Sequence, residues 1–415
     1  MKSTFVQFAI LIFLYAATLG TLAGPADSAD PQAESKSESD SGEQAPHRLH
    51  DFQIKLLETA FEVASDIPVK PHIKSRSLAQ RRVVQTLIEL ENPDMAIRSA
   101  EQIKNWHRGA AHAEVAAFLA ERGDREAALE QLAQAEKIAR AIDTWHKDRI
   151  LAHMAQALEY VKAPSAMKNL TEGIAEHEAA KIHHVRSRLT KPERYAEQMA
   201  SLNELLSETD FDVKRQALLG ASALFDTFYA DPERRDEIEE NIRNAAEELP
   251  ATLKIELFLQ LADAALHHND TAGAVKIVHE CRKLFENAAW RPRFGIPVLA
   301  RIAGTAHRAG DEKTAKSLIE QAKTEYQRKG EEIVNIYRAE TLIPVAEAAR
   351  LSEGENAARA IYRQAMEAAF LNPNSRPRAE DLSAVCLSMA KTGVKPTKSM
   401  WRRLDKLQAQ LGNPW

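Results

Sequence analysis

The sequence predicts an all-α protein built from stacked antiparallel helical hairpins, and three observations support this prediction. Apolar residues recur at three- and four-residue steps through most of the chain, which is the spacing of one face of an α-helix. One longer spacing repeats: a small or apolar residue is followed by similar residues at twelve, sixteen and nineteen positions. The chain has only 15 Gly and 17 Pro in 415 residues, and several of them separate two such apolar segments. This distribution favours long helices joined by tight turns.

The amino-terminal segment has the pattern of an export signal. Lys2 precedes an apolar run at residues 5–23, and the run ends in small residues at the positions that signal peptidase requires. We expect residues 1–23 to be a secretory signal peptide cut near Gly24; the alternative is an uncleaved N-terminal anchor, because about 18 apolar residues can just span a bilayer. The predicted location is therefore exported, periplasmic or extracellular, with membrane attachment only through this segment.

Residues 24–47 differ in composition from everything that follows. They are rich in Ser, Ala, Asp, Glu and Pro and show no apolar periodicity. Such a segment buries too little apolar surface to offset the entropy of ordering, so we expect a disordered acidic linker.

The repeated unit is clearest at residues 297–323. Two amphipathic segments flank a Gly-Asp pair there, so the unit is predicted to be a helical hairpin whose small residues let the two helices approach closely. Its four spaced positions are Ala303, Ala315, Ile319 and Ala322. The same spacing starts again at Val84, Ala116, Met154, Ala262 and Ala346.

The residues between the paired segments are those expected at a turn between helices. Gly closes a helix in a left-handed conformation, and Asp or Asn caps the start of the next one. The five turns of this kind are Asn92-Pro93-Asp94, Gly123-Asp124, Asn269-Asp270, Gly310-Asp311 and Gly354-Glu355.

With these positions and turns, as in VAAFLAERGDREAALEQLAQA at residues 115–135, the chain resembles a tetratricopeptide-like (TPR-like) alpha-solenoid. The resemblance implies hairpins stacked in a right-handed superhelix whose concave face holds a protein or peptide segment. The chain departs from the family in its longer unit, mostly 38 to 43 residues against the usual 34, and in lacking most of the family's first-helix aromatic and closing Pro.

The repeats divide the chain into four segments. We expect N-terminal helical repeats at 48–180, a degenerate helical junction at 181–250, C-terminal helical repeats at 251–382 and a capping hairpin at 383–415. The junction could equally be a diverged pair of repeats. The capping hairpin is predicted because the spacing from Cys386 falls on polar residues, and a polar outer face is what a terminal cap requires. These polar residues are Lys398, Arg402 and Asp405.

Composition and motifs argue against several functions. A net charge of −5 shows no overall excess of basic residues of the kind that binds nucleic acid, and we expect no nucleic-acid partner. Phosphate loops, nucleophile elbows and zinc-protease motifs are absent, so we expect no enzyme, no cofactor and no metal site. Cys281 and Cys386 fit small packing positions. Adjacent histidines such as His267-His268 point about 100° apart on a helix, so we expect solvated or edge-packing roles for them.

The first helix of each hairpin is expected to line the concave face, and this gives the candidate binding residues. Mixed charge there would suit an extended peptide. The predicted function is a non-enzymatic scaffold that binds a protein or peptide partner in the bacterial envelope. The alternatives are an envelope enzyme with an all-helical body, for example a polysaccharide-processing one, and a self-assembling structural element. The sequence leaves the oligomeric state open. The candidate residues are Gln260, Asp263, His267, Arg301, His307 and Arg308.

Overall fold

The computed structural model describes residues 49–163, 170 and 173–415 of the chain. In these residues the regular structure is helical and contains no strand. The expected signal peptide at 1–23 and acidic linker at 24–47 lie outside the described residues. None of the helices in the described part is both long and apolar enough to cross a membrane.

Within the ranges 49–163 and 173–415 the helices follow one another with short connections. The first are α1 (Asp51–Asp66), α2 (Val69–Glu89), α3 (Pro93–Glu101), α4 (His107–Glu121), α5 (Arg125–Arg140) and α6 (His146–Tyr160). The middle contains α8 (Glu176–Ala179), α9 (Ile182–Arg188), η1 (Pro192–Arg194), α10 (Tyr195–Ser207), α11 (Phe211–Thr227) and α12 (Pro232–Ala246). The last are α13 (Ala251–His267), α14 (Thr271–Glu286), α15 (Pro292–Arg308), α16 (Glu312–Lys329), η2 (Gly330–Glu332), α17 (Asn335–Ser352), α18 (Glu355–Phe370), α19 (Ser375–Lys391) and α20 (Lys398–Ala409).

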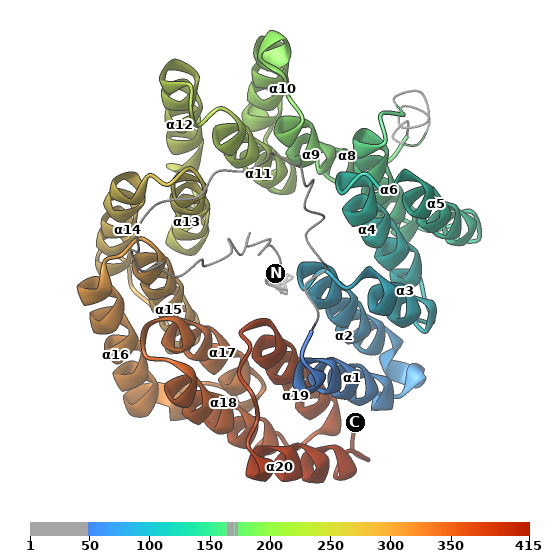
Figure 1. Ribbon diagram of the computed structural model, residues 1–415, viewed down its shortest axis with the longest axis vertical. Coiled ribbons are helices and arrows are strands. Elements are labelled where there is room, and N and C mark those ends of the chain that lie inside the picture. Colours follow the sequence, from blue (N-terminus) through green and yellow to red (C-terminus); the bar gives the residue numbers. More distant parts are fainter. Residues whose placement is uncertain (1–48, 164–169, 171–172) are drawn as a thin grey trace, which may run out of the picture. The chain divides into compact units, whose positions relative to one another are not determined.

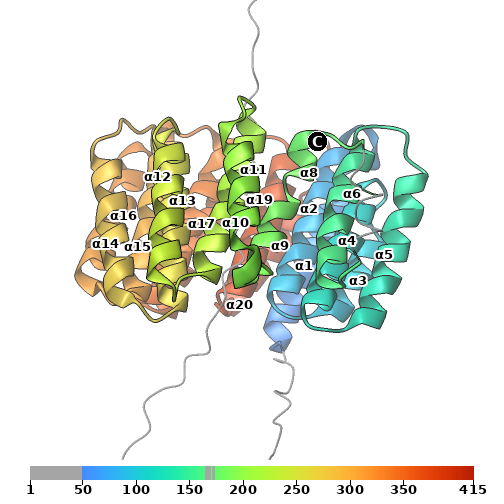
Figure 2. The same ribbon diagram turned by 90° about the horizontal axis from the view of Figure 1, so that it is seen from above.

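The helices form two layers, and the fold is the all-α, solenoid-like one that the repeats predict (Figure 1). Helices α13, α15 and α17 each pack against the following helix as a hairpin, and they also pack against one another. Helices α2 and α4 likewise each pack against the following helix, and α2, α4 and α6 pack in turn against one another, so these three belong to the inner layer; the segment that follows α6 is only partly described. The second helices, such as α14, α16 and α18, lie outside them, and Figure 2 shows the helices of both layers running roughly side by side.

The spaced positions of the repeat form the contact between the two helices of a hairpin. Ala303, Ala315, Ile319 and Ala322 are all fully buried. The corresponding residues that begin at Val84, Ala116, Ala262 and Ala346 are also buried, including Cys281 and Tyr362. In the unit that begins at Met154, the first partner position, 166, lies outside the described residues. Burial at these positions explains why small side chains recur there: each lies where two helices meet.

The predicted turn chemistry is confirmed at four of the five turns; at the fifth, Gly354 is itself the N-cap of α18 and no side chain caps that helix. Gly310 has φ +80°, a left-handed conformation that favours glycine, and the side chain of Asp311 caps α16 by accepting a hydrogen bond from the Thr314 amide. Gly123 and Asp124 do the same between α4 and α5. The residue pairs therefore end one helix and start the next, as the sequence predicts.

The stack closes on itself, which the sequence does not predict. Helix α1 packs more extensively against α19 than against α2, and α2 also contacts α19 (Figure 1). The Gln53 side-chain amide donates a buried hydrogen bond to the Ala390 carbonyl oxygen (2.8 Å), and Lys391 Nζ lies 2.6 Å from Glu89 Oε2. α1 thus takes the place beside α19 that the second helix of a hairpin takes elsewhere.

The segments expected to be a junction and a cap both belong to this continuous stack. Within residues 181–250, α9 packs against α11 and α11 packs against α13. In the last segment α19 lies between α17 and α1, and its Cys386 is fully buried.

The last helix, α20, keeps a buried apolar face, which corrects the expectation that the final unit is polar at its spaced positions. Met400, Leu404 and Leu407 are buried, two positions after the polar residues on which the repeat spacing falls. The connection from Thr392 to the Thr397 N-cap is longer than the Gly-Asp turns, and this moves the buried face of α20 along the chain.

Candidate binding face on helices α11, α13 and α15

The predicted binding residues lie on two neighbouring inner helices. Gln260, Asp263 and His267 belong to α13, and Arg301, His307 and Arg308 belong to α15. His267 and Arg308 are exposed, and the other four are partly exposed. The two helices pack against each other, so the structure brings these residues onto one face.

Two ion pairs join the helices across this face. Arg301 of α15 pairs with Glu256 of α13, and Arg308 pairs with Asp263. Burial raises the pKa of the Asp263 carboxyl, and the Arg308 guanidinium opposes that rise. The face therefore carries alternating acidic and basic groups that already satisfy one another. Glu256 was not among the predicted residues; its place two helical turns before Asp263 is the signal that identifies it.

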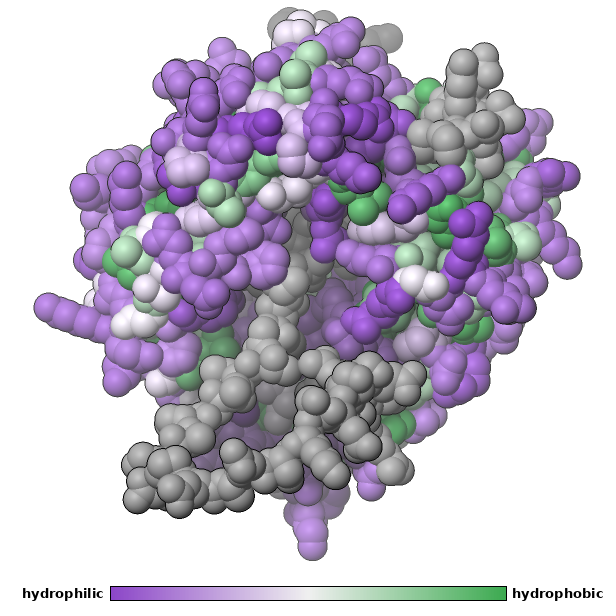
Figure 3. Space-filling view, turned by 45° about the horizontal axis from the view of Figure 1, so that its top comes forward, coloured by the Kyte–Doolittle hydropathy of each residue, from purple (hydrophilic) through white to green (hydrophobic). Residues whose placement is uncertain are grey.

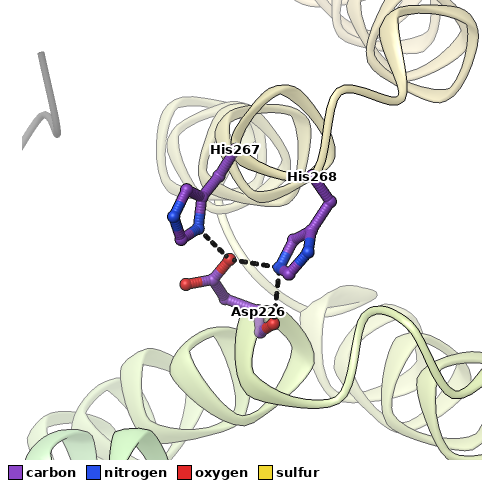
Figure 4. Close-up of side chains that lie close together, drawn as sticks. All are labelled: Asp226, His267 and His268. Carbon is purple, nitrogen blue, oxygen red and sulfur yellow. Dashed lines mark hydrogen bonds and ion pairs between the residues drawn. The ribbon is translucent and has the colours of Figure 1, made fainter. Parts of the chain in front are cut away.

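The third predicted residue of α13 faces the opposite neighbour. His267 Nδ1 lies 2.9 Å from Oδ1 of Asp226, which belongs to α11, and His268 Nε2 lies 3.1 Å from the same oxygen (Figure 4). The expectation that His267 and His268 point apart does not hold at this site. His267 is the last residue of α13, and His268 follows it with φ −92° and ψ 15°, so its ring leaves the helical direction and turns toward α11.

The remaining predicted residues contribute less to this face. His307 Nδ1 lies 2.8 Å from Glu312 Oε1, so this side chain is directed to the turn between α15 and α16 and away from the ion pairs with α13. Gln260 is half-buried on α13. The structure thus brings Asp263, Arg301 and Arg308 together and separates them from His307.

A second polar network connects α2, α4 and α6, and sequence reasoning missed it. Arg81 donates two hydrogen bonds to Glu114 (2.9 and 2.7 Å) and one to His153 Nε2 (2.8 Å). Burial alone would raise the pKa of Glu114, but Arg81 holds it below its usual value. Burial, with Arg81 beside the ring, lowers the pKa of His153 to about 4. The carboxylate is therefore charged and the imidazole neutral at neutral pH, which makes this network a clamp between inner helices.

The tryptophans before α4 and α6 occupy equivalent places, as the repeat predicts. Trp106 stacks on His107 with ring centroids 3.8 Å apart, and Trp145 stacks on His146 at 3.9 Å. The Arg149 guanidinium lies 4.4 Å from the Trp145 ring centroid. Trp106 also packs across the joint between the hairpins, with its ring centroid 4.9 Å from that of His146 and 6.5 Å from that of Trp145, while Trp145 remains 58% exposed.

Among the described residues that Figure 3 leaves in view, hydrophobic residues form small separate groups between hydrophilic ones. Comparison with known proteins adds no identification: a scan against protein-family models and a search of curated proteins both found no match to this chain. The functional argument therefore depends on the geometry of the chain itself.

Proposed function

We propose that this chain is an exported, non-enzymatic, TPR-like scaffold that binds a protein or peptide segment in the bacterial envelope. The observation that supports it most directly is the pair of cross-helix ion pairs, Glu256–Arg301 and Asp263–Arg308, on one partly exposed face of α13 and α15. Helical-repeat proteins present such inner faces as extended binding surfaces.

Binding at this face would exchange one set of ion pairs for another. A partner carboxylate would take over Arg301 or Arg308, and a partner ammonium or guanidinium would take over Glu256 or Asp263. Because both signs of charge alternate along the helices, an extended segment of mixed charge matches the face better than an anionic polymer does. The seams of the hairpins that hold α13 and α15 are buried, so the helices that carry the surface are in place before binding, which lowers its entropic cost.

Crosslinking in the native cell, followed by identification of the captured proteins, tests this proposal. The variant Asp263→Ala/Arg301→Ala removes one member of each ion pair. The matched control, Arg282→Ala/Glu286→Ala, removes an exposed ion pair from the outer helix α14. We expect the first variant to lose a captured partner that the wild type and the control retain. Equal recovery of every partner by both variants would exclude this face, and recovery of the free chain alone would exclude the scaffold.

Export is tested separately by cell fractionation and mass spectrometry of the mature chain. We expect the protein in an envelope or extracellular fraction with its first residue near Gly24. A chain confined to the cytoplasm with residues 1–23 intact would contradict this part of the proposal.

A further inference from the structure

Two histidines and one aspartate from neighbouring inner helices converge at one point. Asp226 lies in the last turn of α11, while His267 ends α13 and His268 follows it. One ligand atom from each residue lies within 4.8 Å of the others, and the three come from two helices of different hairpins (Figure 4). This is a group of imidazole and carboxylate ligands that local sequence spacing does not reveal.

We propose that Asp226, His267 and His268 bind a divalent transition-metal ion of the zinc, nickel or copper type. With metal–ligand bonds of about 2.1 Å, two ligand atoms on one ion lie roughly 3.0 to 3.4 Å apart. The distances from Asp226 Oδ1 to His267 Nδ1 and His268 Nε2 are 2.9 and 3.1 Å, which is close to that separation. The His267 side chain is 54% exposed, so it is free to rotate as the two nitrogens approach the ion.

The side chain of His268 is held in its orientation by a contact with a neighbouring aromatic ring. The His268 ring stacks on Tyr229 with centroids 4.8 Å apart and an angle of 7° between the planes. The Tyr229 hydroxyl in turn donates a hydrogen bond to Asp270 Oδ2 (2.7 Å). Supporting contacts of this kind fix ligand orientation at metal sites. As a ligand, His268 Nε2 must be the unprotonated nitrogen, so its hydrogen moves to Nδ1 and its bond to the Asp226 carbonyl oxygen (2.8 Å) is given up.

The surroundings favour a cation. Helices α11 and α13 both end at this point, and the carboxyl end of a helix carries partial negative charge. Two imidazoles and one carboxylate suit zinc, nickel or copper, whereas calcium and magnesium prefer ligands that are all oxygen. Because the group is exposed, water would complete the coordination of the ion.

The ion would join two parts of the chain. Asp226 lies in the segment 181–250, where the repeat spacing is lost, and the histidines lie in the first hairpin of the regular C-terminal repeats. Binding would therefore clamp α11 to α13. This inference does not rest on the ion pairs between α13 and α15, which use other side chains; of the six predicted binding residues it involves only His267.

Isothermal titration of the untagged, chelator-treated full chain with Zn²⁺ tests the site. We expect one ion per chain, a rise in the unfolding temperature, and a loss of affinity of at least about a hundredfold in His267→Ala and in Asp226→Asn. The control His279→Ala removes an exposed histidine that meets a single carboxylate, Asp311 Oδ2, at 2.8 Å, and it should bind as the wild type does.

Titration with Cu²⁺ followed by electron paramagnetic resonance gives a second measurement that does not depend on stability. The wild type should show hyperfine coupling to two nitrogens, and His268→Ala should show coupling to one. Circular dichroism verifies that each variant remains folded. Binding only at millimolar concentration, unchanged affinity in His267→Ala, or equal losses in His279→Ala would each overturn the proposal.

Discussion

The contribution of the contact between α1 and α19 to stability can be measured with a single substitution at Gln53. Gln53 is 9% exposed, and its amide nitrogen donates to the Ala390 carbonyl oxygen while its Oε1 accepts from the His50 amide. Gln53→Ala removes both hydrogen bonds and leaves the buried Ala390 carbonyl oxygen with one hydrogen-bond donor fewer. We expect α1 to separate from α19 more readily, because no covalent link near the contact restrains it.

The expected magnitude follows from the two hydrogen bonds. Each contributes roughly 1 kcal/mol, and under-satisfying the buried Ala390 oxygen adds to the loss, whereas water replaces the partner of the partly exposed His50 amide. The opening free energy of α1 should therefore fall by about 2 kcal/mol, which corresponds to roughly thirtyfold faster hydrogen exchange when closing is faster than the chemical exchange step.

Hydrogen exchange measured by mass spectrometry resolves this change helix by helix. The increase should appear in α1 and in the face of α19 that it covers, and not in α13 to α16. The control is Gln102→Ala, because Gln102 is exposed and donates only to Arg98 of its own turn (3.3 Å), so its loss should stay within about 0.5 kcal/mol. Equal exchange in both variants, or an increase spread evenly over all helices, would refute the closure argument.

Three further predictions concern stability and reactivity. Burial raises the pKa of Asp381 well above its usual value, so folding favours the protonated carboxyl and the chain loses stability as pH rises above about 3.8. Asp381→Asn should therefore be more stable than wild type in urea at pH 7, with a difference that shrinks toward pH 4; a difference independent of pH would contradict this. Gly310→Ala should destabilise the chain by about 1 kcal/mol because Gly310 has a φ of +80°. Gly304→Ala should stabilise it by a similar amount in the same urea assay, because Gly304 lies inside α15 and an added Cβ would meet its nearest neighbour at 3.8 Å. If both substitutions changed stability in the same direction, the backbone conformation of the glycine would not be what determines the effect. Burial raises the pKa of the Cys281 and Cys386 thiols to about 12, so both should resist a thiol reagent at pH 8 until the chain unfolds, and rapid labelling of the native protein would disprove their burial.

Local sequence patterns predicted the hairpins well. The positions following Ala303 and Ala116 are buried, and the Gly-Asp pairs end and cap helices, because both properties depend on residues fewer than twenty positions apart. The same reasoning predicted no apolar face in the last unit, whereas the buried residues of α20 lie two positions after the polar ones, since its connection is longer and the spacing carries no information about loop length.

The candidate face was predictable in part. Arg301, Arg308 and Asp263 lie on one face because successive inner helices pack side by side. The repeat length of one hairpin brings equivalent positions of these helices next to each other. His307 turned to the next helix of its own hairpin, and the partners Glu256 and Asp226 were missed, because pairing between helices depends on their relative rotation and not on spacing.

The sequence by itself determined the all-helical class, the hairpin unit and the small residues at its seam, since periodicity and turn chemistry are local properties. Only the tertiary structure decided that α1 packs against α19 and that Asp226 meets His267 and His268. The first outcome depends on the angle between successive hairpins, summed over many units, and the second on the relative rotation of the neighbouring helices α11 and α13. Each angle is set by the packing of many side chains at once, so no short pattern records it.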